Sequence, residues 1–307
     1  MSRAVRGVAR FDVVAGLAQR LGVLLDAGIA PVSAWGHAAA GSGSPVAAAI
    51  VERGGVGRDI AEHVLEAREL APAAERSAWS ALGAAWWVAV ESGAPLAPTL
   101  RRFAEMLRSL AQSARDVEVA LAGPLATSRI VLALPAVGLL FGALLGFDAL
   151  RVLVTTAAGW ITGAIGLAFI AVGFRWNGRL VAGARAVDAT PGLALELLAI
   201  AVSGGASIDR SRQLVELALA EGQLPPLGAE ADAVLAFARA AGVPAAAMLH
   251  AEAEELRRSA RSTAQRRAAE LGTRLLLPLG LCILPAFIML GVAPVLLAIV
   301  SSTASGW

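Results

Sequence analysis

Three stretches of the chain carry no charged residue over a length that suits a membrane-spanning helix. They cover residues 130–147, 152–174 and 275–300. A helix rises about 1.5 Å per residue and the hydrocarbon core of a bilayer is about 30 Å thick, so each stretch predicts one transmembrane helix. Only the residues from Asp148 to Arg151 separate the first two stretches. Such a short connection predicts an antiparallel hairpin.

The rest of the sequence has the periodicity of helices and lacks the alternating pattern of strands. Between Thr99 and Leu121, apolar residues recur at intervals of three and four, while most charged residues fall on the opposite face. We expect this helix to stop at Gly123 and Pro124, because proline cannot donate a backbone hydrogen bond. The pattern therefore predicts an all-α integral membrane protein without a sheet.

Two early segments of the chain resemble two later segments, which indicates an internal repeat. The aligned pairs are 21–34 with 198–211 and 92–108 with 241–258. Within them, Gly28 aligns with Gly205 and Gly93 aligns with Gly242. In each case an apolar helix is expected to end at the glycine, which takes the left-handed conformation at little cost. The repeat predicts two antiparallel helical bundles, the second shortened by the counterpart of about residues 54–75.

These elements divide the chain into four parts. We expect an N-terminal helical bundle at 1–125, a transmembrane hairpin at 126–175, a second bundle at 176–274, and a third span with a short tail at 275–307. Arginine accumulates beside the bundles, whereas the hairpin tip carries only Arg151 and the tail carries none. By the positive-inside rule, both bundles and the N-terminus face the cytoplasm, and the C-terminus is external.

Composition supports a multi-pass protein of a bacterial plasma membrane. The chain has 307 residues, of which 57% are hydrophobic and 16% charged, and its mean hydropathy is +0.68. This is too apolar for an ordinary soluble domain. All 26 basic residues are arginine, which fits a GC-rich coding bias. A net charge of +2 gives no support for a nucleic-acid partner. The single cysteine, Cys282, excludes an internal disulfide.

No arrangement of residues indicates catalysis, so we expect no enzyme, cofactor or metal. The three histidines, His37, His63 and His250, do not have the spacing of metal ligands. The glycine-rich stretch 54–58 lacks the lysine and the preceding strand of a phosphate-binding loop, which favours a connection between helices. A membrane transporter or channel component is the alternative function. It would place ionisable residues inside the spans, and the three uncharged stretches contain none.

Three groups of residues each allow a structural and a functional interpretation. Prolines in the third span bend the helix, either as a fixed kink or to shape a groove for another helix. Charged residues near 254–258 form either a solvated face, with ion pairs such as Glu254 with Arg258, or a docking surface. A tryptophan stripe before Gly93 belongs either to the core or to a partner-binding face. The residues concerned are Pro278, Pro285 and Pro294, then Glu254, Glu255 and Arg258, and finally Trp79, Trp86 and Trp87.

The duplicated bundles, the hairpin between them and the final span resemble the F-type inner-membrane platform proteins of type II secretion and type IV pilus systems. Residues 121–160 look like the B-type subunit of actinobacterial Tad (tight adherence) pili, and residues 275–300 look like the end of the C-type subunit. The chain thus resembles a B-type front joined to a C-type back, which would let one chain serve as both.

The resemblance implies a non-enzymatic assembly platform with an F domain repeated twice. Such a platform couples a hexameric secretion ATPase in the cytoplasm to pilin or pseudopilin subunits in the lipid bilayer. The resemblance also implies that the chain functions as a homo-oligomer, or as a hetero-oligomer with another platform subunit. The docking surface around Glu254, Glu255 and Arg258 would then contact the ATPase, and the groove of the third span would receive a pilin helix.

Overall fold

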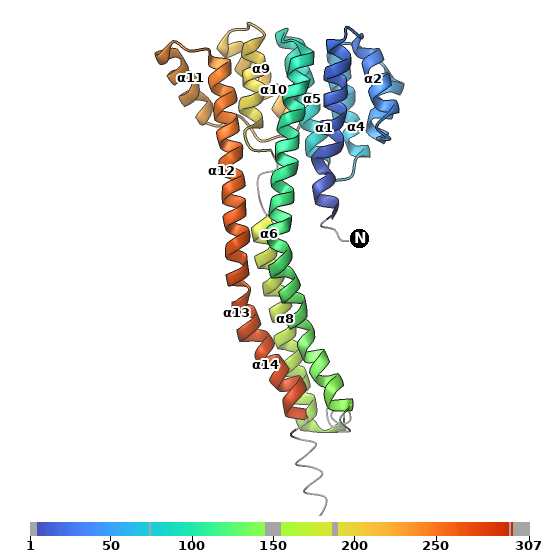
Figure 1. Cartoon of the computed structure of the whole chain (residues 1–307), viewed down its shortest axis with the longest axis vertical. Helices are drawn as coiled ribbons and strands as arrows, with labels where there is room; N and C mark the ends of the chain where they lie inside the picture. Colours follow the sequence, from blue (N-terminus) through green and yellow to red (C-terminus); the bar gives the residue numbers. More distant parts are fainter. Residues whose placement is uncertain (1–4, 74, 145–154, 186–189, 295, 297–307) are drawn as a thin grey trace, which may run out of the picture. The chain divides into compact units, whose positions relative to one another are not determined.

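The computed structural model describes residues 5–73, 75–144, 155–185, 190–294 and 296. Within these residues the regular structure is entirely helical, as predicted, and no strand occurs (Figure 1). The chain forms two compact units. Unit 1 combines Met1–Asp116 with Asp188–Ser262, and unit 2 combines Val117–Val187 with Thr263–Trp307.

The first repeat of unit 1 contains five helices, a 3₁₀ turn and the beginning of a sixth helix. Prolines start α2 and α3, since a first-turn position needs no backbone N–H, and the Ser44 side chain accepts a hydrogen bond from the Ala47 amide at the start of α3. The elements are α1 (Val5–Asp26), α2 (Pro31–Ala40), α3 (Pro45–Arg53), α4 (Arg58–Ala67), η1 (Arg68–Leu70), α5 (Arg76–Ser92) and α6 (Leu96–Leu144).

The second repeat reproduces the helix boundaries of the first at the aligned positions. Its elements are α9 (Leu193–Ser203), α10 (Ile208–Glu221), α11 (Glu230–Ala241) and the beginning of α12 (Ala245–Arg274). The glycines that follow α1, α5, α9 and α11 take the left-handed conformation expected of them. Their φ values are +82° at Gly28, +75° at Gly93, +88° at Gly205 and +67° at Gly242.

The second repeat is shorter, but the missing part begins earlier than predicted. The described connection from Glu221 to Glu230 contains no helix, whereas the first repeat has α3 and α4 at this point. The lost counterpart is therefore residues 45–67 rather than about 54–75.

Helix α5 lies at the centre of a core that both repeats share. It is apolar on all sides, and Trp79, Trp86 and Trp87 are at most 5% exposed, so the core interpretation of this stripe is confirmed. The helix packs against α4 of its own repeat and against α9 and α10 of the other (Figure 1). A helix without a polar face needs cover on every side. For this reason the two repeats form one compact unit.

A very close approach joins the repeats at Gly204. A Cβ atom there would collide with the backbone of Ser92 at the end of α5. Glycine is therefore required by space at this position, in addition to the positive φ required at the neighbouring Gly205.

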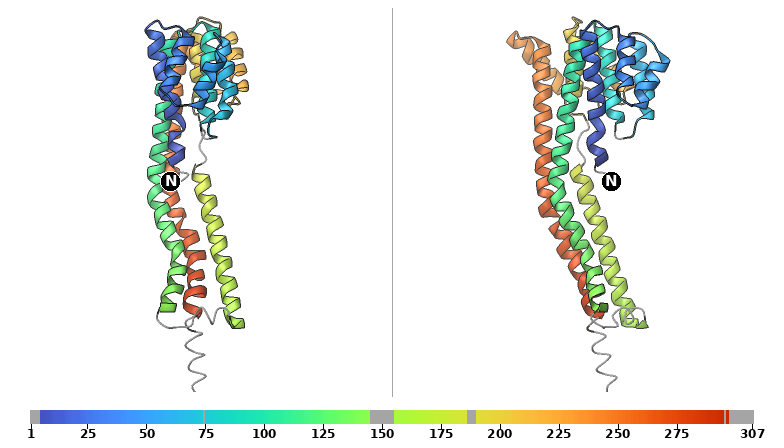
Figure 2. Two further views of the ribbon diagram at one scale, coloured as in Figure 1. Left: turned by 90° about the vertical axis from the view of Figure 1, so that its right-hand side faces the viewer. Right: turned by 45° about the vertical axis from the view of Figure 1, so that its right-hand side comes forward.

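Unit 2 contains the uncharged helical segments that are long enough to be considered as membrane spans. Its elements are the remainder of α6, α8 (Ala157–Arg185), the end of α12, α13 (Leu276–Pro278) and α14 (Leu284–Phe287), with π-helical turns η2 (Leu279–Ile283) and η3 (Ile288–Val292). Helix α8 lies beside α14 and both π-helical turns (Figure 2). A small apolar cluster of Leu121, Ala268, Leu271 and Leu275, packed with Leu180 and Val181, joins α6, α8 and α12.

Helix α6 passes through Gly123 and Pro124 without ending, so the predicted helix stop was wrong. A proline removes only one backbone hydrogen bond, and a long helix retains its bonds on both sides. The one carbonyl that loses its amide partner is that of Ala120, four residues before the proline, and the helix continues on both sides of it.

Two helical segments, Ala157–Ala182 and Ala245–Val292, are long and apolar enough to cross a membrane. They contain most of the predicted second and third spans. The predicted first span, 130–147, overlaps the end of α6, and its last three residues lie outside the described part of the chain. The hairpin tip at 148–151 and the external tail also lie outside it, so the count of three spans stays a prediction.

Each π-helical turn ends two residues before a proline, Pro285 or Pro294. The Leu284 amide donates to the Leu279 carbonyl, and the Ala293 amide donates to the Ile288 carbonyl, five residues back in both cases. The wider turn provides room for the proline ring, which would clash with a carbonyl in a regular α-helix. The helix thus accommodates its prolines by widening rather than by breaking.

Candidate functional sites

The three charged residues predicted as a docking surface are exposed on α12. The Arg258 Nε atom lies 3.3 Å from the Glu255 carboxylate, and these side chains are 65% and 63% exposed. The partner of Arg258 is therefore Glu255, three residues earlier, rather than Glu254 as predicted. Exposed pairs of this kind contribute only about 0–1 kcal/mol, so their charges remain available to another protein. Their role in binding stays a prediction.

A buried acid cluster joins α9 to α12 in the second repeat. Glu196 on α9 is 3% exposed. Its carboxylate lies 2.9 Å from His250 Nδ1 and 3.4 Å from Arg257 Nη1, both on α12. Burial alone would raise the pKa of Glu196, but the hydrogen bonds and charges of His250 and Arg257 outweigh it and lower the pKa below its ordinary value. The carboxylate is therefore held ionised inside the unit.

The first repeat makes the matching contact without a buried charge. Gln19 aligns with Glu196, and Arg108 aligns with Arg257. Arg108 Nη1 donates to Gln19 Oε1 at 3.2 Å, near the surface. The same pair of helices is thus joined at the same position in both repeats, once by a neutral amide and once by an ionised acid.

This contact in the first repeat belongs to a ladder between α1 and α6. Arg101 Nη1 donates to Asp26 at 2.7 Å, and Arg115 Nη1 donates to Asp12 at 2.7 Å, on either side of the Gln19 contact. Successive members lie seven residues apart on each helix. Because residues seven apart share one helix face, this spacing is the sequence signal that could have shown the ladder in advance.

Sequence reasoning missed the Glu196 cluster, although a signal for it exists. Glu196 is the only charged residue in α9, and an isolated ionised carboxylate is costly to bury without a partner. His250 and Arg257 lie seven residues apart and therefore on one face of α12. The histidine spacing spoke only against a metal site, and the structure places His250 beside Glu196.

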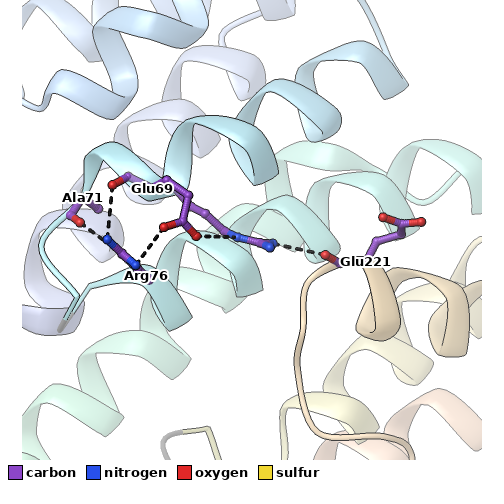
Figure 3. A network of polar contacts seen from close by, with 5 residues as sticks. Glu69, Ala71, Arg76 and Glu221 are labelled. Atoms are coloured by element: carbon purple, nitrogen blue, oxygen red, sulfur yellow. Dashed lines mark hydrogen bonds and ion pairs between the residues drawn. The ribbon is translucent and has the colours of Figure 1, made fainter.

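A second polar network includes a contact between the two repeats (Figure 3). Arg68 Nη1 in η1 donates to the Glu221 carbonyl at the end of α10, at 3.1 Å. Glu69 pairs with Arg76 at 2.7 Å, and Arg76 also donates to the Ala71 carbonyl at 3.4 Å (Figure 3). These contacts hold the segment before α5 against the second repeat.

In unit 2, glycines allow close contact with the proline-containing helix. A Cβ at Gly173 would meet Cys282 and Ile283, and one at Gly138 would lie 2.7 Å from the Phe287 ring. Pro278 and Pro294 are buried, and Pro285 is half-buried. Of the small residues expected to line a groove, Gly291 faces Gly138 of α6, whereas Gly280 is exposed and has open space beside it.

The glycine-rich stretch forms a connection between helices α3 and α4, as predicted. Gly54, Gly55 and Gly57 have positive φ, and the Val56 amide is occupied by Asp59 at 3.4 Å. Within the described residues, no group of three or more histidine, cysteine or acidic side chains is arranged to hold a metal ion.

Comparison with known protein families gives a match to the first repeat. The model of the family described as "Type II secretion system (T2SS), protein F" matches residues 17–143. The matched part begins within α1, includes the rest of the first repeat and ends within the last turn of α6. No curated protein and no solved structure matches the chain. The match supports a relationship to the T2SS protein F family through the first repeat, to which the second repeat is similar in sequence and helix boundaries.

Proposed function

We propose that this chain is a non-enzymatic inner-membrane platform of a type II secretion or type IV pilus system, of the Tad type. The match of the T2SS protein F family to residues 17–143 carries the proposal. The two segments able to cross a membrane support it. Deleting the gene should abolish surface pili or secretion without loss of the pilin precursor, and expression of the chain should restore them. Normal pilus formation in the deletion strain would contradict the proposal.

The proposed topology places residues 1–129 and 175–274 in the cytoplasm and the C-terminus outside. The arginine distribution supports it, since eleven of the arginines that flank the apolar stretches lie on the proposed cytoplasmic side, at residues 115, 129, 175, 179, 185, 257, 258, 261, 266, 267 and 274. Reporter fusions at residues 120 and 220 should report the cytoplasm, and a fusion at the C-terminus should report the exterior. An external residue 220 would contradict the three-span scheme.

We place the contact with a hexameric secretion ATPase on the exposed face of α12. Glu254, Glu255 and Arg258 support this site because they are exposed and neutralised only by a weak pair. Reversal of both acids to arginine should weaken co-purification with the ATPase. A matched control is Glu105→Arg, because Glu105 is the exposed counterpart of Glu254 in the first repeat. Equal co-purification of the wild type and the double variant would show that this face of α12 does not bind the ATPase.

The partner in the bilayer is proposed to be a pilin or pseudopilin helix packed near Gly280. The open space at Gly280 supports this position, while Gly291 already faces α6. In a Cys282→Ala background, cysteine at position 280 should cross-link to the apolar segment of the pilin, and cysteine at position 291 should not. Cross-links from position 280 only to the chain itself would contradict a pilin groove.

A further inference from the structure

The net charge of +2 conceals an uneven distribution of charge between the two units. Unit 1 contains 18 arginines and 21 acidic residues, a formal charge of −3. Unit 2 contains 8 arginines and 3 acidic residues, a formal charge of +5. The more basic unit is the one that holds the long uncharged segments 157–174 and 275–292. Its positive charge therefore lies beside the segments that would enter the bilayer.

Several of these arginines lie at one level along the helices of unit 2. Leu180 and Val181 of α8 pack in the cluster that contains Leu271 of α12 and the following Leu275, and Gly173 of α8 lies against Cys282. Residues 173–181 of α8 therefore lie beside residues 271–282, which belong to the end of α12, α13 and η2 and are called the partner helix below. Arg175, Arg179 and Arg274 all fall in this interval, and all three are exposed.

This level is also where the charged part of the helices ends. Residues 157–174 of α8 and 275–292 of the partner helix carry no charge. Trp176 is half-buried at the same level, and tryptophan is enriched where membrane proteins meet the headgroup region. The arginines therefore lie at the height of lipid headgroups if the uncharged parts lie in the hydrocarbon core.

The protein supplies little negative charge to these arginines. Within the described residues, Arg175 and Arg179 form no ion pair with a carboxylate, and Arg274 pairs only with the exposed Glu270 at 3.0 Å. By contrast, arginines of unit 1 such as Arg76, Arg101 and Arg115 each lie 2.7 Å from an acid. Guanidinium groups match phosphate well, since they donate two parallel hydrogen bonds.

We propose that Arg175, Arg179 and Arg274 form a binding site for the phosphate headgroups of anionic phospholipids. The lipid supplies the negative charge that unit 2 lacks, and its acyl chains cover the apolar surface next to the arginines. The site therefore selects anionic over zwitterionic lipid, and its contribution falls as salt screens the charges.

The test uses the full chain purified in a neutral detergent, with bound phosphatidylglycerol counted by native mass spectrometry during a lipid titration. Arg175→Gln with Arg179→Gln should weaken binding of this lipid roughly 10- to 30-fold, as expected for two arginines at an anionic surface. The control Arg20→Gln with Arg102→Gln removes two exposed arginines of unit 1 and should leave binding unchanged. Replacing Arg175 and Arg179 by lysine should restore only part of the binding, because lysine returns the charge but not the two parallel hydrogen bonds.

Two further ligands distinguish binding of the anionic lipid from general lipid binding and from binding of phosphate alone. Phosphatidylcholine should bind equally to all variants, and inorganic phosphate at millimolar concentration should not displace phosphatidylglycerol if the acyl chains contribute. Equal loss in the test and control variants, or displacement by free phosphate, would overturn the lipid site. Circular dichroism of each variant shows whether the helices persist, and the result does not depend on pilus assembly or secretion.

Discussion

The two repeats of unit 1 join equivalent helices at equivalent positions with different chemistry. The first repeat uses Gln19 and Arg108 near the surface, and the second uses Glu196 with Arg257 and His250 in the interior. The difference follows from the burial of the two helices. Helix α9 is buried on almost every side by α5 and α10, whereas α1 has an exposed side. The same pair of helices can thus be joined by a neutral contact near water or by an ion cluster in the core. Loss of one partner should destabilise the buried ion cluster more than the exposed neutral contact.

The largest effect is expected from Glu196→Ala. This change leaves Arg257 and His250 largely buried without a carboxylate, which should cost about 3–5 kcal/mol of unfolding free energy. The matched change Gln19→Ala in the first repeat should cost less than about 1 kcal/mol, because Arg108 is exposed to water. Denaturant unfolding of the purified chain in detergent measures both. Similar losses would show that the two contacts are equivalent after all.

A smaller loss, of about 1–3 kcal/mol, is expected from Gly204→Ala. The new Cβ would collide with the Ser92 backbone and push the two repeats apart. The aligned position of the first repeat is Ala27, which is exposed and already carries a Cβ. Ala27→Gly should therefore change stability by less than about 1 kcal/mol. A stable Gly204→Ala protein would contradict the close approach, and the melting temperatures of the two variants decide the matter.

The repeats should also differ in their response to acid. The pKa of Glu196 is lowered in the folded protein, so its stabilising effect is complete above the ordinary value of 4.5 and is lost as pH falls through the lowered pKa. Glu196→Gln should retain a hydrogen bond to Arg257, as Gln19 does to Arg108, and should reduce the loss of stability below about pH 4.5. Melting temperatures of the wild type and variant between pH 3 and 7 test this. Parallel curves would contradict the assignment.

The smallest effect is expected when the first repeat is made more like the second. Gln19→Glu would complete the ladder of acids facing Arg101, Arg108 and Arg115. The new pair is exposed, so it should stabilise the protein by about 0.2–1 kcal/mol, and high salt should remove the gain. The melting temperature at low and high salt measures it. A loss of stability at low salt would show that the amide is preferred at this position.

The sequence predicted the local parts of the fold well and its long-range parts poorly. Helix ends at Gly28, Gly93, Gly205 and Gly242 depend on a left-handed glycine and the next helix start, which neighbouring residues reveal. The shared core could not be predicted in this way. The apolar character of α5 shows that it is buried, but not that α9 and α10 of the other repeat cover it.

The candidate sites show the same limit. Exposure of Glu254, Glu255 and Arg258 follows from helical periodicity, yet the partner of Arg258 depends on side-chain conformation. The Glu196 cluster needs two segments more than fifty residues apart in sequence to meet, and only the fold brings them together. The helix through Pro124 was missed because proline usually ends a helix in water, whereas an apolar helix can continue past it.

The π-helical turns have a consequence for which side chains share a face. Buried residues in this helix recur every four positions, at Pro278, Cys282, Ala286, Leu290 and Pro294. In a regular α-helix each such step would drift by about 40°, so the last of these residues would point almost opposite to the first. The wider turns take up this drift. Without the wider turn of η2, the eight steps from Pro278 to Ala286 would turn Ala286 about 80° away from the face of Pro278, so the geometry of this segment matters as much as its hydrophobicity.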